Sequence, residues 1–327
     1  MKAALLVRPG QIEVEDIPEP EVGPEDVRIA VGGVGLCGSD LSVFSGTWAA
    51  PSYPWVMGHE AFGSIEAVGA EVDSARVGQT VVVEPNIACL TCAQCRRGLT
   101  SACVERKSIG MNRPGALAER LVVPARFAWP IRGVAPADLV CVEPMTVVTA
   151  ALRRLGTALP ASVLVVGVGA QGLLMSLALL NRSVAVYVRD VNPARVAFAE
   201  QLGATAAAPD QDERRFDLVV DTVGSPASVE VALGSLDVGG TLLLLGLDNR
   251  PLSVTAQMLV RRQAIVRGSL TYDHPADFEA AIRIVAERRF APGRIVSDEF
   301  PLADAQRAFD RSPSASGKTW IRVAQKS

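Results

Sequence analysis

The first part of the chain, residues 1 to about 145, shows short runs in which apolar and polar positions alternate. Gly and Pro separate these runs, and alternation of this length between turn residues predicts strands of a β-rich domain. A longer apolar pattern at residues 142–156 predicts a helix that ends this region. The predicted strands are AALLV (3–7), DVRIAV (26–31), GSIEAV (63–68), TVVVEP (80–85) and AERLVV (118–123).

The pattern changes after residue 162, where apolar strands alternate with helical segments. This alternation predicts a parallel sheet that is covered by helices on both faces. The C-terminal part then predicts amphipathic helices at 274–289 and 297–311 and a closing strand, KTWIRV, at 318–323. The predicted strands of the sheet are 162–167, 183–190, 217–224 and 239–246, and its helices are 171–181, 193–204 and 226–236.

The composition sets limits on the fold and the partners. A chain of 327 residues, 49% hydrophobic and 20% charged, predicts two globular domains. The net charge of −3 without a basic block excludes nucleic acid and anionic membrane as expected partners. The N-terminal apolar run is too short for a signal peptide, so we expect a cytoplasmic protein. Val163–Leu180 has the length of a membrane span, but three glycines within it argue against a single helix.

A glycine-rich turn follows the first strand of the predicted parallel sheet. Gly167, Gly169 and Gly172 have the G-x-G-x-x-G spacing that lets backbone amides at a helix N-terminus bind a pyrophosphate. Asp190 ends the next strand, where a carboxylate accepts hydrogen bonds from a ribose and repels a 2′-phosphate. NAD is therefore favoured over NADP, although the positive charges of Arg189 and Arg195 would suit the 2′-phosphate of NADP. A turn that binds nothing is the alternative.

Four of the six cysteines, Cys89, Cys92, Cys95 and Cys103, lie within one short and otherwise polar segment. Four thiolates this close can surround one tetrahedral zinc and leave no position open for a substrate, which predicts a structural site. An iron–sulfur cluster is the chemical alternative. Disulfides are not expected in a cytosolic chain.

A second set of metal-binding residues is spread over the first half of the chain. Cys37 lies between glycines in GLCGSD, and His59 precedes Glu60 in GHEAFG. A sulfur, a nitrogen and a carboxylate from Glu60 or Glu143 would leave the fourth zinc position open, as in a catalytic site. A buried or turn histidine is the plainer interpretation of His59, and Cys141 is interpreted as a small buried hydrophobe.

These motifs together resemble the zinc-containing medium-chain dehydrogenase/reductase family, which includes alcohol, sorbitol and threonine dehydrogenases. The match runs almost from end to end, through GLCGSDL, GHEAFGSIEAVG, the four-cysteine segment, VVGVGAQG, DTVG, GGTLLLLG and GKTWIRV. The resemblance implies an α/β protein with a GroES-like β-rich catalytic domain, residues 1–145 completed by 272–327. It also implies a Rossmann NAD-binding domain, a doubly wound parallel sheet, at 146–271.

The resemblance also implies roles for individual residues. Cys37 and His59 are the expected catalytic zinc ligands, Glu60 is a ligand or an adjacent carboxylate, and Asp40 orients His59. Glu143 stands where the polyol-dehydrogenase branch has a glutamate. The expected cofactor-binding residues are Gly167, Gly169, Gln171, Gly172, Asp190, Arg195 and Val223.

One position departs from the family pattern. Many members have a histidine five residues after the catalytic cysteine, and here that residue is Ser42. Ser39, whose hydroxyl can both donate and accept, is therefore the expected proton relay, and its alternative role is a helix cap. Trp48 either lines the substrate pocket or packs against other side chains of the protein. The CGSDLS motif followed by GTW also resembles dehydrogenases of aminocyclitols.

The sequence thus predicts a zinc-dependent oxidoreductase that transfers a hydride between a secondary alcohol, of the polyol, sugar or cyclitol class, and NAD. We expect two zinc ions per chain, one catalytic and one structural, and a dimer or tetramer in which GGTLLLLGL supplies the sheet edge. Alternatives are a simple alcohol or threonine-like dehydrogenase, an inert zinc- and nucleotide-binding protein, and a zinc-free reductase, which usually lacks both cysteine sets.

Overall fold

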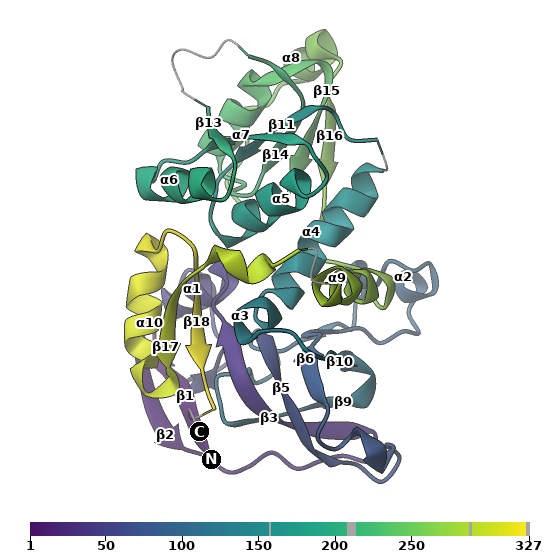
Figure 1. Ribbon diagram of the computed structural model, residues 1–327, viewed down its shortest axis with the longest axis vertical. Helices are drawn as coiled ribbons and strands as arrows, with labels where there is room; N and C mark the ends of the chain where they lie inside the picture. Colours follow the sequence, from purple (N-terminus) through teal and green to yellow (C-terminus); the bar gives the residue numbers. More distant parts are fainter. Residues whose placement is uncertain (157, 208–213, 288–289, 325–327) are drawn as a thin grey trace. The chain divides into compact units, whose positions relative to one another are not determined.

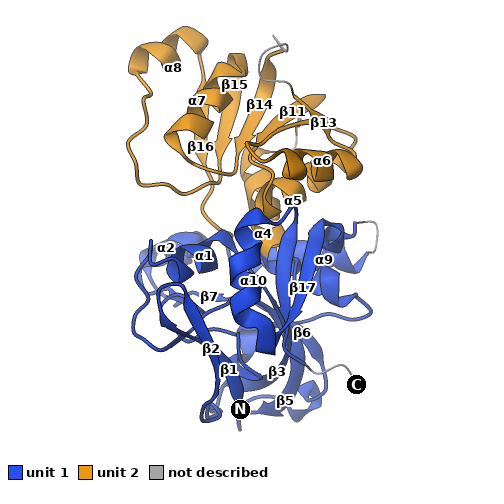
Figure 2. Ribbon diagram, turned by 90° about the vertical axis from the view of Figure 1, so that its left-hand side faces the viewer, with its two compact units in different colours: residues 1–143, 273–327 blue, residues 144–272 orange. Residues whose placement is uncertain are grey.

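The computed structural model describes residues 1–156, 158–207, 214–287 and 290–324. The chain divides into two compact units, drawn in different colours in Figure 2. Unit 1 contains residues 1–143 and 273–327, and unit 2 contains residues 144–272. The boundaries expected from the sequence, 145 and 272, lie within two residues of the observed 143 and 273.

Unit 1 is built around a mixed sheet in the order β10-β6-β5-β3-β18-β17, in which β9 also pairs with β3, and a small sheet in the order β2-β1-β4 (Figure 1). Alternate residues of β3, such as Val27 and Ile29, are buried on the core side, as period-two patterning requires. The strands are β1 (Lys2–Arg8), β2 (Gln11–Asp16), β3 (Asp26–Gly35), β4 (Trp55–Val56), β5 (Glu60–Val68), β6 (Thr80–Val83), β7 (Asn86–Ile87), β8 (Lys107–Ser108), β9 (Arg120–Pro124), β10 (Ala128–Pro130), β17 (Val296–Pro301) and β18 (Lys318–Arg322).

Both ends of the chain complete this unit. Strand β18 pairs antiparallel with β3, so that Trp320 lies opposite Gly35. The predicted helix at 297–311 is wrong in its first half: β17 is a strand parallel to β18, and its alternating exposure shows a period of two, which sequence reading took for a helix. The helices of unit 1 are α1 (Gly38–Phe44), α2 (Ala93–Arg96), α3 (Pro136–Leu139), α9 (Ala276–Ala286) and α10 (Ala305–Arg311). The last two residues of the predicted helix at 274–289 lie outside the described residues.

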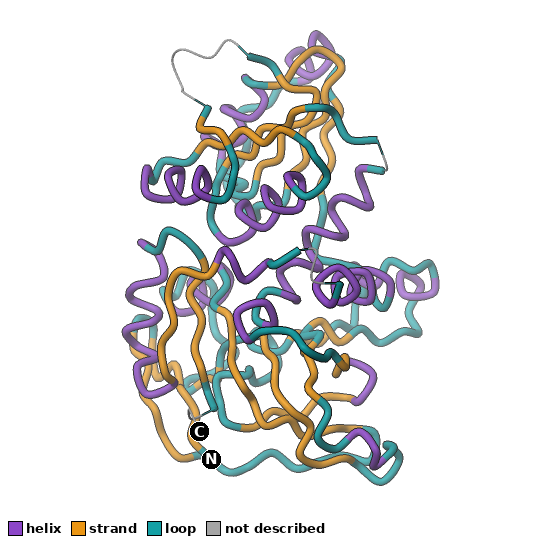
Figure 3. Tube along the Cα trace, in the orientation of Figure 1, coloured by secondary structure: helices purple, strands orange, loops and turns teal. Residues whose placement is uncertain are grey.

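Unit 2 is a six-stranded parallel sheet in the order β13-β12-β11-β14-β15-β16, with strands and helices alternating along the chain (Figure 3). Helices α5 and α6 pack on β11 to β13, and α7 packs on β14 and β15. The predicted doubly wound α/β fold is confirmed. The elements are β11 (Ser162–Val166), α5 (Ala170–Leu180), β12 (Ala185–Arg189), α6 (Pro193–Gln201), β13 (Thr205–Ala206), β14 (Phe216–Asp221), α7 (Pro226–Gly234), β15 (Leu236–Leu244), α8 (Ala256–Arg262) and β16 (Ile265–Gly268), and α4 (Val142–Leu155) leads into this unit.

Two expectations about apolar segments are settled by these elements. The segment Val163–Leu180 is divided into β11 and α5, and among the described residues no helix has the length and apolarity of a membrane span. The segment GGTLLLLGL does not form the sheet edge, because β15 lies between β14 and β16. Strand β16 was missed since its four residues are too short a run to stand out from the sequence.

Candidate functional site

The four cysteines at 89–103, called here the four-cysteine loop, converge on one point. Their sulfur atoms all lie within 4.8 Å of one another. The Cys89 and Cys103 sulfurs are 3.5 Å apart, and all four thiols are free of disulfides. This donor set fits one tetrahedral zinc ion, as the spacing predicted.

The backbone of the loop holds these sulfurs. The Cys92 amide donates to the Cys89 sulfur over 3.3 Å, and the Cys89 amide donates to the Cys103 sulfur over 3.3 Å. Hydrogen bonds from Thr91 lower the pKa of Cys89 to about 6, whereas burial raises the pKa of Cys95 to about 12. Cys89 is thus poised as a thiolate, whereas Cys95 needs a nearby cation before it ionises.

A second donor group brings together Cys37, His59 and Glu60, whose ligand atoms also lie within 4.8 Å of one another. Cys37 precedes the first turn of α1, and Glu60 begins β5, so that a helix N-terminus and a strand start place the donors. The structure thus brings Cys37 and His59 together with Glu60, one of the two carboxylates that the sequence left open as the third donor, and the chemistry of these three residues fits zinc with one position open.

Asp40 organises this group. The Asp40 Oδ1 atom lies 3.1 Å from His59 Nδ1, and its Oδ2 atom accepts from the Cys37 amide over 3.0 Å. Burial alone would lower the pKa of His59, but the Asp40 carboxylate and Cys37 raise it well above its ordinary value. Because Nδ1 faces Asp40, Nε2 is the ring nitrogen that remains available to a metal ion, and the carboxylates around it favour a cation.

Lys318 is a residue of this site that sequence reasoning missed. Its side chain is fully buried, and its ammonium group donates to Glu60 Oε2 and to the Leu36 carbonyl, the latter over 3.2 Å. Burial alone would lower the pKa of Lys318, but the Glu60 carboxylate raises it above its ordinary value. The available signal was a lone lysine in the apolar closing strand KTWIRV.

Two further residues of the predicted catalytic set, Glu143 and Ser39, lie on helices α4 and α1. Glu143 is buried in the first turn of α4 and is not part of the three-residue donor group among the described residues. Ser39 lies inside α1, whose N-cap is Cys37, and the Ser42 hydroxyl donates to the Gly38 carbonyl. Burial raises the pKa of Cys141 to about 12, so its thiol stays neutral.

The glycine turn of unit 2 has three different surroundings at its three glycines. Gly167 has φ +82°, and a Cβ atom there would overlap Val223. A Cβ atom on Gly172 would overlap the Gly167 carbonyl oxygen. At Gly169 the nearest atom to such a Cβ, Arg195 Nη1, is 3.9 Å away, so this is where the turn leaves room for a ligand.

The side chains around the turn support it. The Asp190 Oδ2 atom accepts from the Val168 amide over 2.8 Å. The Thr222 hydroxyl donates to the Gly167 carbonyl over 2.8 Å. Gln171 Nε2 donates to the Pro144 carbonyl, while its buried Oε1 atom has no partner among the described residues. An orphaned acceptor beside an open turn is consistent with a ligand that completes the site.

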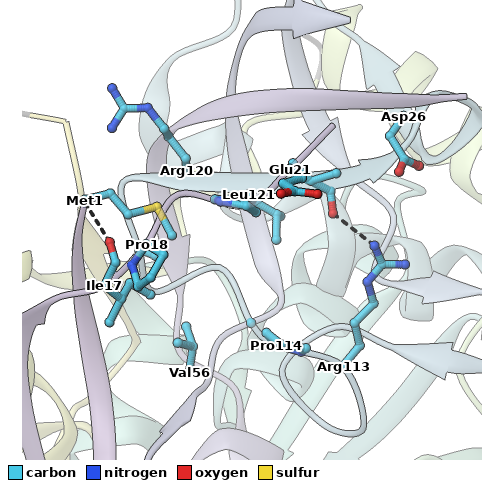
Figure 4. A pocket seen from close by; sticks show the side chains of 14 residues that line it. Met1, Ile17, Pro18, Glu21, Asp26, Val56, Arg113, Pro114, Arg120 and Leu121 are labelled. Atoms are coloured by element: carbon cyan, nitrogen blue, oxygen red, sulfur yellow. Dashed lines mark hydrogen bonds between the residues drawn. The ribbon is translucent and has the colours of Figure 1, made fainter. Parts of the chain in front are cut away.

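A separate pocket of about 300 Å³ in unit 1 contains none of these residues. Figure 4 shows its lining, where the Arg113 guanidinium donates to the Val122 carbonyl and the Met1 ammonium to the Ile17 carbonyl. The Arg113 and Met1 cations thus have partners within the protein, and neither of the two clusters of metal donors lies in this pocket.

Comparison with known proteins agrees with this geometry. The alcohol dehydrogenase GroES-like domain matches residues 23–133, and the zinc-binding dehydrogenase domain matches residues 167–287. D-altritol 5-dehydrogenase of Agrobacterium fabrum is 31% identical over 326 residues, covering 96% of each chain. This protein belongs to the zinc-containing medium-chain dehydrogenase family. As a member, it is an enzyme of the alcohol dehydrogenase type, and the predicted family is confirmed.

Solved structures of the family have the same fold over the whole chain. An Escherichia coli CFT073 alcohol dehydrogenase crystallised with NADH has a TM-score of 0.91 and 26% identity, covering 99% of both chains. Galactitol-1-phosphate dehydrogenase of Escherichia coli has a TM-score of 0.90 and 28% identity, covering 99% of this chain and 100% of its own.

Proposed function

We propose that this protein interconverts a secondary alcohol, of the polyol, sugar or cyclitol class, and the corresponding ketone, with zinc and NAD. The observation that carries the proposal is the Cys37, His59 and Glu60 donor group, which leaves a coordination position for a substrate oxygen. The glycine turn with open space at Gly169 supports the nucleotide part of the proposal.

The residues divide the chemistry among them. Cys37 Sγ and His59 Nε2 would hold the catalytic zinc, with Glu60 or Glu143 as the third ligand, and Cys89, Cys92, Cys95 and Cys103 would hold the structural one. When bound, zinc supplies Lewis acidity that makes a substrate hydroxyl more acidic, and NAD supplies the hydride acceptor. Asp40 fixes the ring orientation of His59. The Ser39 hydroxyl then receives the substrate proton and passes it to water.

The cofactor residues act through their positions around the turn. Backbone amides at the start of α5 would bind the pyrophosphate, and the Arg195 guanidinium lies beside Gly169. Asp190, which accepts from the Val168 amide here, would accept hydrogen bonds from the ribose hydroxyls of NAD, and its charge would disfavour NADP. Arg189 is engaged elsewhere, since it donates to the Ala207 carbonyl and the Ser235 hydroxyl. Val223 and Gln171 complete the cofactor contacts.

The substrate class is supported by relatives that act on sugar alcohols, D-altritol 5-dehydrogenase and galactitol-1-phosphate dehydrogenase. The glutamate at position 143 and the aminocyclitol-type CGSDLS motif agree with a polyhydroxylated substrate. Trp48, which is 41% exposed in the loop after α1, is the proposed wall of the substrate pocket.

The test is NADH formation against a panel of alditols, sugar acids, cyclitols, aminocyclitols, threonine and simple alcohols. Wild type is compared with Cys37→Ala, and Cys141→Ala is the matched control, a buried cysteine outside the donor group. We expect turnover of a polyhydroxylated substrate that Cys37→Ala abolishes and Cys141→Ala retains. Turnover restricted to threonine or simple alcohols would reject the substrate class. Binding of zinc and NADH without any turnover would favour an inert binding protein.

We also propose a homo-oligomer that pairs through unit 2. Strand β16 is the sheet edge, and its Ile265 and Val266 side chains are 50% and 43% exposed. An apolar uncovered edge favours pairing with a second copy. We expect Ile265→Lys to shift the sedimentation equilibrium toward the monomer. The free state of all six cysteines is consistent with the proposed cytoplasmic location.

A further inference from the structure

The chain returns to unit 1 at Asp273, and residues 273–277, called here the return segment, lead into α9. The Asp273 Oδ1 atom accepts from the Ser101 amide over 3.0 Å. The His274 amide donates to the Thr100 hydroxyl over 2.6 Å. Thr100 and Ser101 form the 3₁₀ turn that ends at Cys103. The return segment is therefore bonded directly to the backbone that positions the fourth cysteine.

A buried carboxylate connects the same segment to the sheet of unit 1. Glu84 follows β6 and is completely buried. Its Oε2 atom lies 2.8 Å from His274 Nδ1 and accepts from Trp129 Nε1 over 2.8 Å. Five residues further along the chain is Cys89, the first cysteine of the loop. Glu84 thus lies shortly before the start of the four-cysteine loop in sequence, and His274 bonds to Thr100 near the end of the loop.

Aromatic rings enclose this pair. The His274 ring centroid lies 4.8 Å from that of Phe127 and 5.8 Å from that of Trp129, and Trp129 stacks on Phe278 of α9 at 5.7 Å. The second oxygen of Glu84 is buried with no partner among the described residues, and burial raises the pKa of this carboxyl. Asp277 adds its own negative charge nearby.

A buried, incompletely satisfied polar pair is costly, so a site that keeps one requires an explanation beyond packing. The catalytic donor group does not supply it, because Glu84 and His274 are not among its residues. What the pair does join is the four-cysteine loop and the return segment, two parts of the chain that are 170 residues or more apart in sequence.

We propose that the Glu84–His274 pair couples metal binding by the four-cysteine loop to docking of the return segment and α9. A metal ion that fixes Thr100 and Ser101 stabilises the docked segment, and the docked segment slows loss of the metal. Such coupling is reciprocal, because each event changes the free energy of the other by the same amount. Glu84 and His274 are positioning residues in this scheme and touch no substrate.

The reciprocal effect is measured first in the full-length chain by hydrogen–deuterium exchange. The Cys37→Ser background removes the catalytic donor set, so that the remaining zinc reports on the four-cysteine loop. We expect removal of that zinc to raise amide exchange in residues 273–286 as well as in 89–103. Unchanged exchange in 273–286, or a loop that holds no zinc, would overturn the proposal without the use of any variant of the pair.

The forward effect is measured as the rate of zinc transfer to a chromophoric chelator in the same background. His274→Phe keeps the ring contacts and removes the bond to Glu84, and Glu84→Gln keeps the shape and removes the charge. We expect each variant to release zinc on the order of tenfold faster, as for loss of a hydrogen bond to a charged group. Glu279→Gln, the same change at an exposed position of α9, is the control and should release zinc at the unaltered rate. Equal rates in all four proteins would refute the coupling.

Discussion

Alanine substitutions at two glycines of the same turn should cause two different defects. Gly169 has φ −67°, which alanine adopts readily, and its Cβ atom would meet nothing closer than 3.9 Å. Gly172 lies in α5, where a Cβ atom would overlap the Gly167 carbonyl oxygen and stand 3.3 Å from Thr222 Oγ1. Gly169→Ala should therefore impair cofactor binding, and Gly172→Ala should impair folding.

The magnitudes follow from these contacts. Overpacking against rigid backbone at Gly172 costs about 1–3 kcal/mol, of which alanine recovers up to about 1 kcal/mol through its helix propensity. A net loss of about 1–2 kcal/mol lowers the melting temperature by roughly 4 °C. Gly169→Ala costs about 0.5 kcal/mol as a weaker helix cap. Its methyl group would stand in the open space where we propose that the pyrophosphate binds, which should weaken NADH binding about tenfold or more.

The assays are thermal unfolding without cofactor and titration of NADH by its fluorescence. Gly234→Ala is the control, since this glycine of α7 has open space around it and no left-handed φ, and the substitution should leave both readings unaltered or raise stability slightly. Equal melting losses for Gly169→Ala and Gly172→Ala, or unchanged NADH affinity in Gly169→Ala, would refute the reasoning.

Three further predictions concern charged groups of unit 1. Lys318→Met leaves Glu60 buried without its cation and should lower the free energy of unfolding, measured in denaturant, by about 3–5 kcal/mol. The double variant with Glu60→Gln should recover much of this stability, and no recovery would contradict the ion-pair argument. Burial raises the pKa of the Glu84 carboxyl in the folded protein above its ordinary value of 4.5. The protonated carboxyl therefore stabilises the folded state fully below pH 4.5, and this stabilisation is lost as the pH rises through the pKa of the folded protein. The free energy of unfolding of wild type, measured relative to Glu84→Gln, should fall as the pH rises through this interval. Cys89 has a pKa of about 6 and Cys95 a pKa of about 12, so Cys89 should be alkylated first in metal-free protein near neutral pH. Peptide mass spectrometry would show the order of alkylation, and the reverse order would contradict this prediction.

The fold was largely predictable where patterns are long and local. The glycine turn and the four-cysteine loop are contiguous in sequence, so spacing alone places their atoms together. Strand β16 and strand β17 were not recognised, because a four-residue run and a short polar alternation carry little periodic signal. Lys318 was missed because its partner Glu60 is 258 residues away, and the two are brought together by the pairing of both β18 and β5 with β3.

The buried charges of unit 1 explain why the catalytic donor group suits a divalent cation. Asp40, Glu60 and Lys318 are each at most 2% exposed, although charged side chains are rarely buried without partners. A metal-bound Cys37 would be a thiolate, so that three anionic groups would face one ammonium and leave two negative charges for the metal ion to neutralise. Without metal, a proton on His59 offsets part of this charge, in agreement with its raised pKa. A doubly charged ion would neutralise the group completely, so metal binding should release protons and stabilise the folded protein together.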